Sequence, residues 1–201
     1  METRHKAPMS KLPNNKNSLR IIGGQWRGRK LAFPDAQGLR PTPDRVRETL
    51  FNWLVPYVGG ARCLDLFAGS GALGLEALSR GASEVVLVDS HAEVIKYLNE
   101  HVRLLDATAR ARLVKADARA FLEATTEIKT APFDIVFLDP PYHSGLLQPC
   151  MSLLQNGWLS TAARIYFEAN RDEPLPELPK GWSIYREKTA GQVGFYLAQP
   201  D

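Results

Sequence analysis

Residues 133–142 read Phe133-Asp134-Ile135-Val136-Phe137-Leu138-Asp139-Pro140-Pro141-Tyr142. The first six are almost wholly apolar, which is typical of a strand buried on both faces of a parallel sheet. Each proline restricts the residue before it to extended conformations, so the chain cannot pass directly from this strand into a helix. The sequence therefore predicts a rigid shelf at the carboxyl edge of the sheet, where open α/β sheets bind ligands.

This shelf combines hydrogen-bond acceptors with a stacking surface. The Asp139 carboxylate, the Pro140 carbonyl and the Tyr142 ring suit a flat base that carries an exocyclic amine. An ordinary exit from a strand into a loop, with the prolines as punctuation and the tyrosine as packing, is the alternative that these residues alone leave open.

Strands and helices alternate on both sides of the shelf. We expect strands at 62–67, 84–89, 111–116, 133–139 and 163–168, and helices at 72–80, 92–105, 118–125 and 146–155. This alternation predicts a doubly covered α/β fold with a mostly parallel sheet of seven strands. The last two strands, at 182–188 and 193–198, flank Ala190-Gly191 and predict a closing antiparallel hairpin.

The chain before residue 59 divides into a tail and a small module. Residues 1–18 are polar and basic, and we expect them to be disordered. Residues 19–58 contain two short β-like runs around a glycine-rich turn, and then an amphipathic helix. Thr42 is expected to cap this helix and Pro43 to take its first position. The main domain then spans residues 59–201.

Charge is distributed unevenly along the chain. Through Arg47 there are 11 basic and 3 acidic residues, a net +8, whereas the remainder holds 14 basic and 19 acidic residues, a net −5. A basic head suggests a polyanion held through its phosphates, although a merely solvated tail would also be basic. The candidate contacts to phosphates and unpaired bases are Arg20, Trp26, Arg27, Arg29, Lys30, Arg40, Thr42, Arg45 and Arg47. For Trp26, pinning the hairpin to the body is an equal alternative.

Composition points to a globular domain in a reducing compartment. Of the 201 residues, 44% are hydrophobic and 23% are charged, and no apolar run approaches the length of a membrane span. The N-terminus lacks the apolar core of a signal peptide, so we expect a cytoplasmic protein. Cys63 and Cys150 are expected to be buried free thiols, and no metal-ligand spacing is present.

A glycine-rich loop follows the first strand of the main domain, in the segment Asp65-Leu66-Phe67-Ala68-Gly69-Ser70-Gly71-Ala72-Leu73-Gly74. Glycines let the backbone approach a ligand, and the next helix presents free N–H groups to it. Asp65 lies where a dinucleotide would need its pyrophosphate, and a carboxylate repels phosphate. The loop therefore favours S-adenosylmethionine, which has an amino group and no phosphate.

Acidic residues also end the next two strands. Asp89, about twenty residues beyond the loop, is suited to bind a ribose diol. Asp117 could accept the adenine amino group, with Ala118 packing near the ring, but it could equally be only a helix cap. The predicted cofactor-binding residues are Asp65, Phe67, Ala68, Gly69, Ser70, Gly71, Asp89, Asp117 and Ala118.

Together these features resemble the Rossmann-like class I methyltransferases that act on exocyclic amines. Finer motifs are similar to those of the RsmD family, namely Ile21-Ile22-Gly23-Gly24, Arg27-Gly28-Arg29, Arg40-Pro41-Thr42, Asp44-Arg45-Val46-Arg47-Glu48, Phe51-Asn52 and Phe67-Ala68-Gly69-Ser70-Gly71. The resemblance runs from about Leu19 to Ala198. It implies transfer of a methyl group from S-adenosylmethionine to N2 of guanine 966 of bacterial 16S rRNA, within a small ribosomal subunit. It also implies no metal and no membrane partner, and we expect a monomer.

Two other readings stay open at this point. Asp-Pro-Pro-Tyr also serves enzymes that methylate the N6 of adenine in DNA or RNA, although the small basic module favours structured RNA. A catalytically silent RNA-binding assembly factor could keep the same fold, and intact Asp139 and loop glycines count against it. A nicotinamide oxidoreductase is disfavoured by Asp65.

Overall fold

The computed structural model describes residues 18–33, 42–124, 131–141, 143–172 and 174–201. The predicted tail, apart from Ser18, lies outside this part of the chain, as do Arg40 and Tyr142. The N-terminal elements are β1 (Ser18–Arg20), the short 3-10 helix η1 (Gly24–Trp26), β2 (Lys30–Ala32) and α1 (Asp44–Val58). The main domain comprises β3 (Arg62–Asp65), α2 (Ala72–Ser79), β4 (Glu84–Asp89), α3 (Ala92–Leu104), β5 (Ala111–Lys115), α4 (Ala118–Ala124), β6 (Phe133–Leu138), α5 (Leu147–Leu154), β7 (Leu159–Asn170), β8 (Trp182–Ala190) and β9 (Val193–Pro200).

A seven-stranded sheet in the order β5-β4-β3-β6-β7-β9-β8 forms the centre of the molecule. Strands β3 to β7 pair in parallel, and β9 pairs antiparallel with both β7 and β8. The predicted α/β class, the parallel strands and the closing hairpin are confirmed. After β5 the chain crosses to the other side of β3, so the strand order reverses between β3 and β6. Ligands of open α/β sheets bind at such a switch point.

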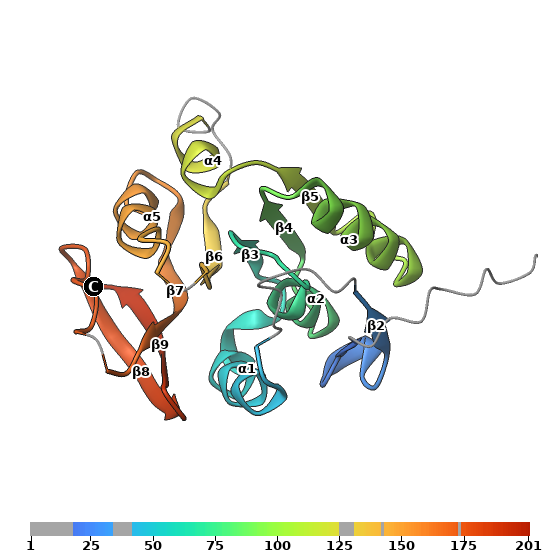
Figure 1. The fold of residues 1–201 in the computed structure, drawn as a ribbon, viewed down its shortest axis with the longest axis horizontal. Coiled ribbons are helices and arrows are strands. Elements are labelled where there is room, and N and C mark those ends of the chain that lie inside the picture. The colour runs from blue at the N-terminus through green and yellow to red at the C-terminus, as the bar shows by residue number, and fades with distance from the viewer. Residues whose placement is uncertain (1–17, 34–41, 125–130, 142, 173) are drawn as a thin grey trace, which may run out of the picture.

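Helices cover both faces of the sheet (Figure 1). On one face α1, α2, α3 and the β1–β2 hairpin share a hydrophobic core with alternate residues of the central strands. On the other face α4 and α5 pack on the remaining residues of those strands. The predicted RNA module at 19–58 thus contributes side chains to the same core as the main domain.

Hydrophobic patterning explains why these helices form where they do. Every residue of α2 is buried, because the helix lies between the sheet, α1 and the hairpin. In α1 the buried Val46, Leu50 and Leu54 recur every four residues and form one stripe. Trp53 of the same helix stacks on Phe195 of β9, with ring centroids 5.4 Å apart.

The start of α1 differs from the prediction. Pro43 takes the N-cap position without a side-chain capping bond, and the helix begins at Asp44. The Pro43 carbonyl accepts hydrogen bonds from the N–H groups of Val46 and Arg47, at 2.9 and 3.1 Å. The Thr42 hydroxyl does not cap the helix, because it donates to Asp139 across the site described below.

The described residues also show the state of the cysteines and whether metal-binding clusters or membrane-spanning helices occur among them. Cys63 and Cys150 are free and buried, as predicted. Within the described ranges, no group of three or more His, Cys, Asp or Glu side chains could hold a metal ion. None of the helices in that part of the chain has the length and apolar character needed to cross a membrane.

Candidate active site

The candidate site lies at the carboxyl edge of the sheet, around the switch point between β3 and β6. Asp65 ends β3, and Asp89 ends β4 on one side of it. On the other side Asp139 follows the last residue of β6, because that strand ends at Leu138 instead of including the acid. Parallel strands bring these acids to a single edge, as the sequence predicts.

The glycine-rich loop connects β3 to α2 at this edge. Its backbone is fixed by two hydrogen bonds, from the Ala68 N–H to the Val88 carbonyl (2.9 Å) and from the Gly71 N–H to the Ala68 carbonyl (2.7 Å). Gly71 has a φ of +78°, and a Cβ added there would lie 2.7 Å from Leu98 Cδ2. A side chain at this position would therefore be strained by the backbone and obstructed by packing.

Asp65 lies beneath the loop and organises it. Its side chain accepts hydrogen bonds from the backbone N–H groups of Gly74, at 3.0 Å, and Phe67. Burial raises the pKa of the Asp65 carboxyl to about 7, although the two backbone donors lower it. An anion bound next to this acid would be repelled, whereas a cationic ligand would favour its ionised form. Asp65 is almost inaccessible, so it holds the loop in place and acts on a ligand through its charge instead of by direct contact.

Asp89 ties the end of β4 to the same loop. Its Oδ2 accepts a hydrogen bond from the Gly69 N–H at 3.0 Å, and its Oδ1 accepts one from the His91 N–H at 2.9 Å. An ionised carboxylate has about four acceptor positions, so the half-buried side chain retains capacity for the hydroxyls of a ribose. The Tyr97 hydroxyl donates to the Gly69 carbonyl and supports the loop from α3.

Asp117 acts as a helix cap in this structure. Its Oδ1 accepts hydrogen bonds from the N–H groups of Arg119 (2.9 Å) and Ala120 (3.1 Å) at the start of α4. This is one of the two roles that the sequence leaves open. Ala118 is buried against the core of the α4–α5 face, so its packing is explained without a ligand.

Asp139 is half-buried at the centre of the site. Its Oδ2 accepts a hydrogen bond from the Thr42 hydroxyl at 3.4 Å. Burial raises the pKa of the Asp139 carboxyl well above its ordinary value, and the nearby Glu168 and Asp65 carboxylates raise it further. The Thr42 hydroxyl acts in the opposite direction. Pro140, also half-buried, follows at the edge of the sheet.

Sequence reasoning missed Glu168 of β7 as a member of this site. The signal was present, because the expected strand at 163–168 ends in an acid, like the expected strands at 84–89 and 133–139. What could not be read from the sequence was that β7 pairs directly with β6.

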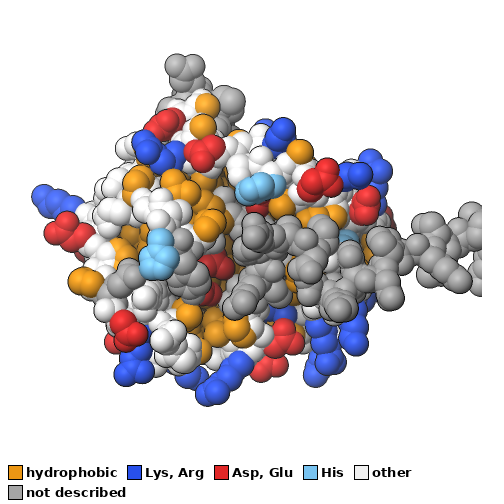
Figure 2. All heavy atoms as spheres, viewed as in Figure 1, with side chains coloured by type: hydrophobic (Ala, Val, Ile, Leu, Met, Phe, Trp, Pro, Cys, Tyr) orange, Lys and Arg blue, Asp and Glu red, His pale blue; other side chains and the backbone are white. Residues whose placement is uncertain are grey.

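Some of the residues predicted to contact RNA are exposed and others are buried. The exposed side chains are those of Arg20, Arg27, Arg29, Lys30 and Arg45. Lysine and arginine side chains gather over the N-terminal hairpin in Figure 2, at the lower right. Trp26, Thr42 and Arg47 are buried in this structure, and for them an RNA contact stays a prediction. Trp26 pins the hairpin to the body, which was the alternative reading.

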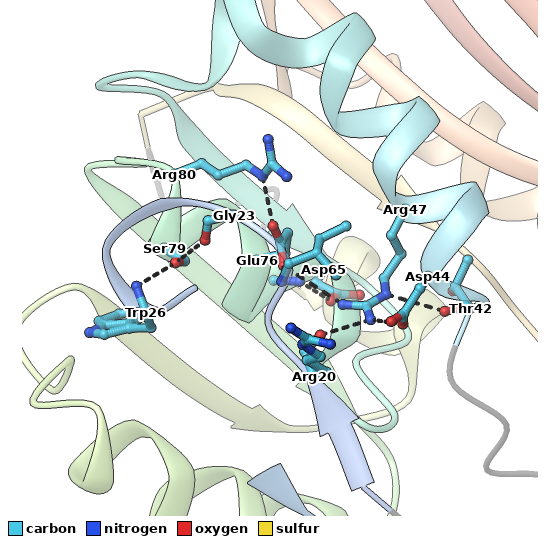
Figure 3. Close-up of polar contacts among 12 residues, drawn as sticks. Arg20, Gly23, Trp26, Thr42, Asp44, Arg47, Asp65, Glu76, Ser79 and Arg80 are labelled. Carbon is cyan, nitrogen blue, oxygen red and sulfur yellow. Dashed lines mark hydrogen bonds and ion pairs between the residues drawn. The ribbon is translucent and has the colours of Figure 1, made fainter. Parts of the chain in front are cut away.

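The Arg47 guanidinium makes its contacts within the protein (Figure 3). It donates to the carbonyls of Arg20 (2.9 Å) and Thr42 (3.2 Å) and pairs with the Asp44 carboxylate at 2.5 Å. It also lies 3.7 Å from the carboxylate of Glu76, which is fully buried in α2. The guanidinium thereby joins the hairpin, the start of α1 and the main domain.

Comparison with known proteins gives consistent matches over nearly the whole chain. The family model described as Conserved hypothetical protein 95 matches residues 19–199. Ribosomal RNA small subunit methyltransferase D of Escherichia coli K12 is 52% identical over 192 residues, covering 94% of each chain. The protein of the same name from Haemophilus influenzae is 45% identical over 190 residues, covering 93% of this chain and 96% of its own.

Solved structures agree with these matches. The Escherichia coli protein yhhF, described as a methyltransferase, superposes with a TM-score of 0.83 at 49% identity, covering 92% of this chain and 99% of its own. The Haemophilus influenzae protein HI0767, described as a methylase, gives 0.77 at 42% identity with the same coverage. A Streptococcus mutans protein described as a SAM-dependent methyltransferase gives 0.64 at 15% identity, covering 84% of this chain and 52% of its own, and shares the fold.

Proposed function

The chain belongs to the RsmD family of methyltransferases, and from that premise we propose that it transfers a methyl group from S-adenosylmethionine to N2 of guanine 966 of 16S rRNA. The substrate is the small ribosomal subunit, in the cytoplasm. The observation that carries the proposal is Asp139, an acceptor held at the sheet edge beside the glycine-rich loop. The names of the relatives from Escherichia coli and Haemophilus influenzae support an rRNA substrate.

The residues of the loop suit S-adenosylmethionine better than a nucleotide with a pyrophosphate. The buried acid beneath the loop, Asp65, disfavours a phosphate group and favours a cation. Asp89 has remaining acceptor positions for a ribose diol. When bound, S-adenosylmethionine would supply an electrophilic methyl group: a nitrogen–carbon bond forms as a sulfur–carbon bond breaks, and the nitrogen then releases one proton.

Asp139 and Pro140 would prepare the amine for this transfer. The lone pair of an exocyclic amine is delocalised into the ring, so the nitrogen is a poor nucleophile. Hydrogen bonds from the amine to the Asp139 carboxylate and the Pro140 carbonyl favour a pyramidal nitrogen with an available lone pair. A base within structured RNA must be splayed or flipped to reach this edge. We propose that Tyr142 stacks on the flipped base.

The exposed basic side chains of the N-terminal module would hold the RNA backbone. Arg20, Arg27, Arg29 and Lys30 extend from the β1–β2 hairpin, and Arg45 from the first turn of α1. Thr42 precedes that same helix and contacts Asp139, so the module that holds the RNA also borders the catalytic carboxylate. Arg40, which lies outside the described residues, is proposed as a further RNA contact.

Tritiated methyl transfer onto small subunits isolated from cells without the modification tests the proposal directly. We expect label on one guanine of 16S rRNA, mapped to N2. The Asp139→Ala variant should bind cofactor and subunits while its transfer rate falls by at least about 100-fold, as for removal of one preorganised polar group. Label on an adenine, on a ribosomal protein or on DNA would overturn the assignment.

A further inference from the structure

Glu168 lies directly beside Asp139 at the edge of the sheet. Leu138 of β6 pairs with Phe167 of β7 in parallel register, and each acid is the next residue along its chain. Neighbouring strands lie about 4.8 Å apart, so the two backbone positions are adjacent.

The two acids also share one face of the sheet. Phe137 and Tyr166 point into the core shared with α1, whereas Leu138 and Phe167 point into the core of α4 and α5. Side chains alternate along a strand, so Glu168 is on the face of Tyr166. Asp139 reaches the same face, since it contacts Thr42 at the start of α1.

The Glu168 side chain is held in place by its neighbour on the strand. The hydroxyl of Tyr166, a fully buried residue, donates a hydrogen bond of 2.5 Å to Glu168 Oε1. Both acids are half-buried, and the Glu168 carboxylate raises the electrostatic cost of ionising Asp139. A ligand that offers two adjacent hydrogen-bond donors would remove that cost.

We propose that Glu168 is the residue that selects guanine, by accepting the N1–H of the base while Asp139 accepts from its N2 amine. This inference rests on the proposed function. Guanine presents N1–H and N2–H as neighbouring donors on its Watson–Crick edge. Adenine and cytosine instead place a ring-nitrogen acceptor beside their amines, and that lone pair would face the Glu168 carboxylate. Two adjacent acceptors therefore match guanine and reject the other amino bases.

The test replaces the target guanine by 2-aminopurine in reconstituted small subunits. This base retains the amine at C2 but lacks O6 and has an acceptor at N1, so it differs from guanine at the atom that Glu168 would contact. For the wild-type enzyme we expect kcat/KM for transfer to 2-aminopurine to be about 10- to 100-fold lower than for guanine, the range for losing a hydrogen bond to a charged group. Equal rates on the two bases would overturn the proposal without any variant.

The Glu168→Gln variant provides the second measurement. A glutamine amide can accept from N1–H or donate to an N1 acceptor, so the preference for guanine should fall several-fold or more. The acid limb of the pH profile should also move to lower pH, because the variant removes a negative charge beside Asp139. Glu177→Gln, in an exposed loop, is the matched control and should leave both measurements unchanged.

These outcomes separate the two proposals. If the wild-type enzyme transfers no methyl group to guanine, the proposed function fails. If it methylates guanine but Glu168→Gln lowers transfer to both bases equally, with an unchanged acid limb, the residue is only structural and the inference fails alone.

Discussion

At the scale of single residues, Asp139 is surrounded by groups that shift its pKa in opposite directions. Burial and two neighbouring carboxylates favour the protonated acid, while the Thr42 hydroxyl favours the ionised form. A protonated carboxyl retains less acceptor capacity for an amine. The activity should therefore fall as pH drops through the raised pKa, at a higher pH than for an ordinary aspartate.

Replacing Thr42 by Val removes the hydroxyl while nearly retaining the shape of the side chain. The pKa of Asp139 should rise further, so the acid limb of kcat/KM moves to higher pH, and activity at neutral pH falls by up to about tenfold. The measurement is a pH–rate profile on small subunits. Thr42→Ser retains the donor and should restore the wild-type profile; if both variants behave alike, the hydrogen bond has no role in transfer.

At the scale of elements, α2 serves two parts of the protein at once. Its N-terminus carries the glycine-rich loop, while Glu76 and Ser79 near its C-terminus accept hydrogen bonds from the hairpin (Figure 3). The Ser79 hydroxyl donates to the Gly23 carbonyl at 2.6 Å and accepts from the Trp26 N–H at 3.0 Å. The hairpin thus docks through its backbone on the helix that positions the cofactor loop.

Gly24 and Gly28 form a matched pair for testing this docking. Both have positive φ, +72° and +84°, but a Cβ on Gly24 would lie 1.8 Å from the Ser79 carbonyl oxygen, whereas nothing lies within 4 Å of one on Gly28. Gly28→Ala should lower the free energy of unfolding only by the backbone strain, which is about 1–2 kcal/mol. Gly24→Ala should lower the free energy of unfolding by about 3 kcal/mol or more and weaken binding to RNA.

Denaturant titrations of the two glycine variants measure the difference, with equilibrium binding to small subunits as the second readout. Equal destabilisation by the two substitutions would contradict close docking of the hairpin on α2.

Glu76 is the buried acid at the centre of the network around α2. It accepts from the Ile22 N–H (2.9 Å) and from Arg80 Nε (2.7 Å), and it pairs with Arg47. Glu76→Gln removes the acidic partner of Arg80 and one of the two acidic partners of Arg47, and it should lower the free energy of unfolding by about 3–5 kcal/mol. The control is Glu84→Gln. It removes the ion pair between Glu84 and Arg62, which is more exposed than the pairs of Glu76, and should lower the free energy of unfolding by about 0–1 kcal/mol. Chemical unfolding measures the stability of the two variants. Equal losses of unfolding free energy would contradict a central role of Glu76 in the buried network.

At the scale of the whole molecule, the basic N-terminal module and the carboxyl edge of the sheet belong to one folded body. The β1–β2 hairpin packs beside α2 and α3, and the closing β8–β9 hairpin lies at the opposite end of the sheet (Figure 1). Phosphate contacts should therefore concentrate at the end of the molecule that carries the exposed arginines and Lys30.

Binding to small subunits should weaken with salt in proportion to the number of phosphates that these side chains neutralise. For the double variant Arg27→Ala, Lys30→Ala we plot the logarithm of the association constant against the logarithm of the salt concentration. The magnitude of this negative slope should fall by about 1 for each phosphate that the variant no longer neutralises. The matched control is Lys188→Ala, an exposed lysine on β8. Identical slopes for the double variant and the control would show that the hairpin is not part of the RNA interface.

Most of the fold could be predicted from local patterns. Apolar runs, glycines and prolines fixed the type and order of the strands and helices, and element ends moved by only a few residues. β7 is the exception: it runs from Leu159 to Asn170, longer than the expected strand at 163–168. The acids at strand ends were also predictable, since parallel strands present their carboxyl ends at one edge.

The sequence by itself determined the sheet, the loop and the acids, because each depends on patterns within a few residues. Only the tertiary structure decided which of two chemically similar residues faces solvent. Arg45 and Arg47 lie two positions apart, yet one is exposed and the other is buried between the start of its own helix, the hairpin and α2. Thr42 contacts Asp139 across 97 positions, and Glu168 neighbours it through strand pairing. Such contacts depend on long-range packing, which no local pattern contains.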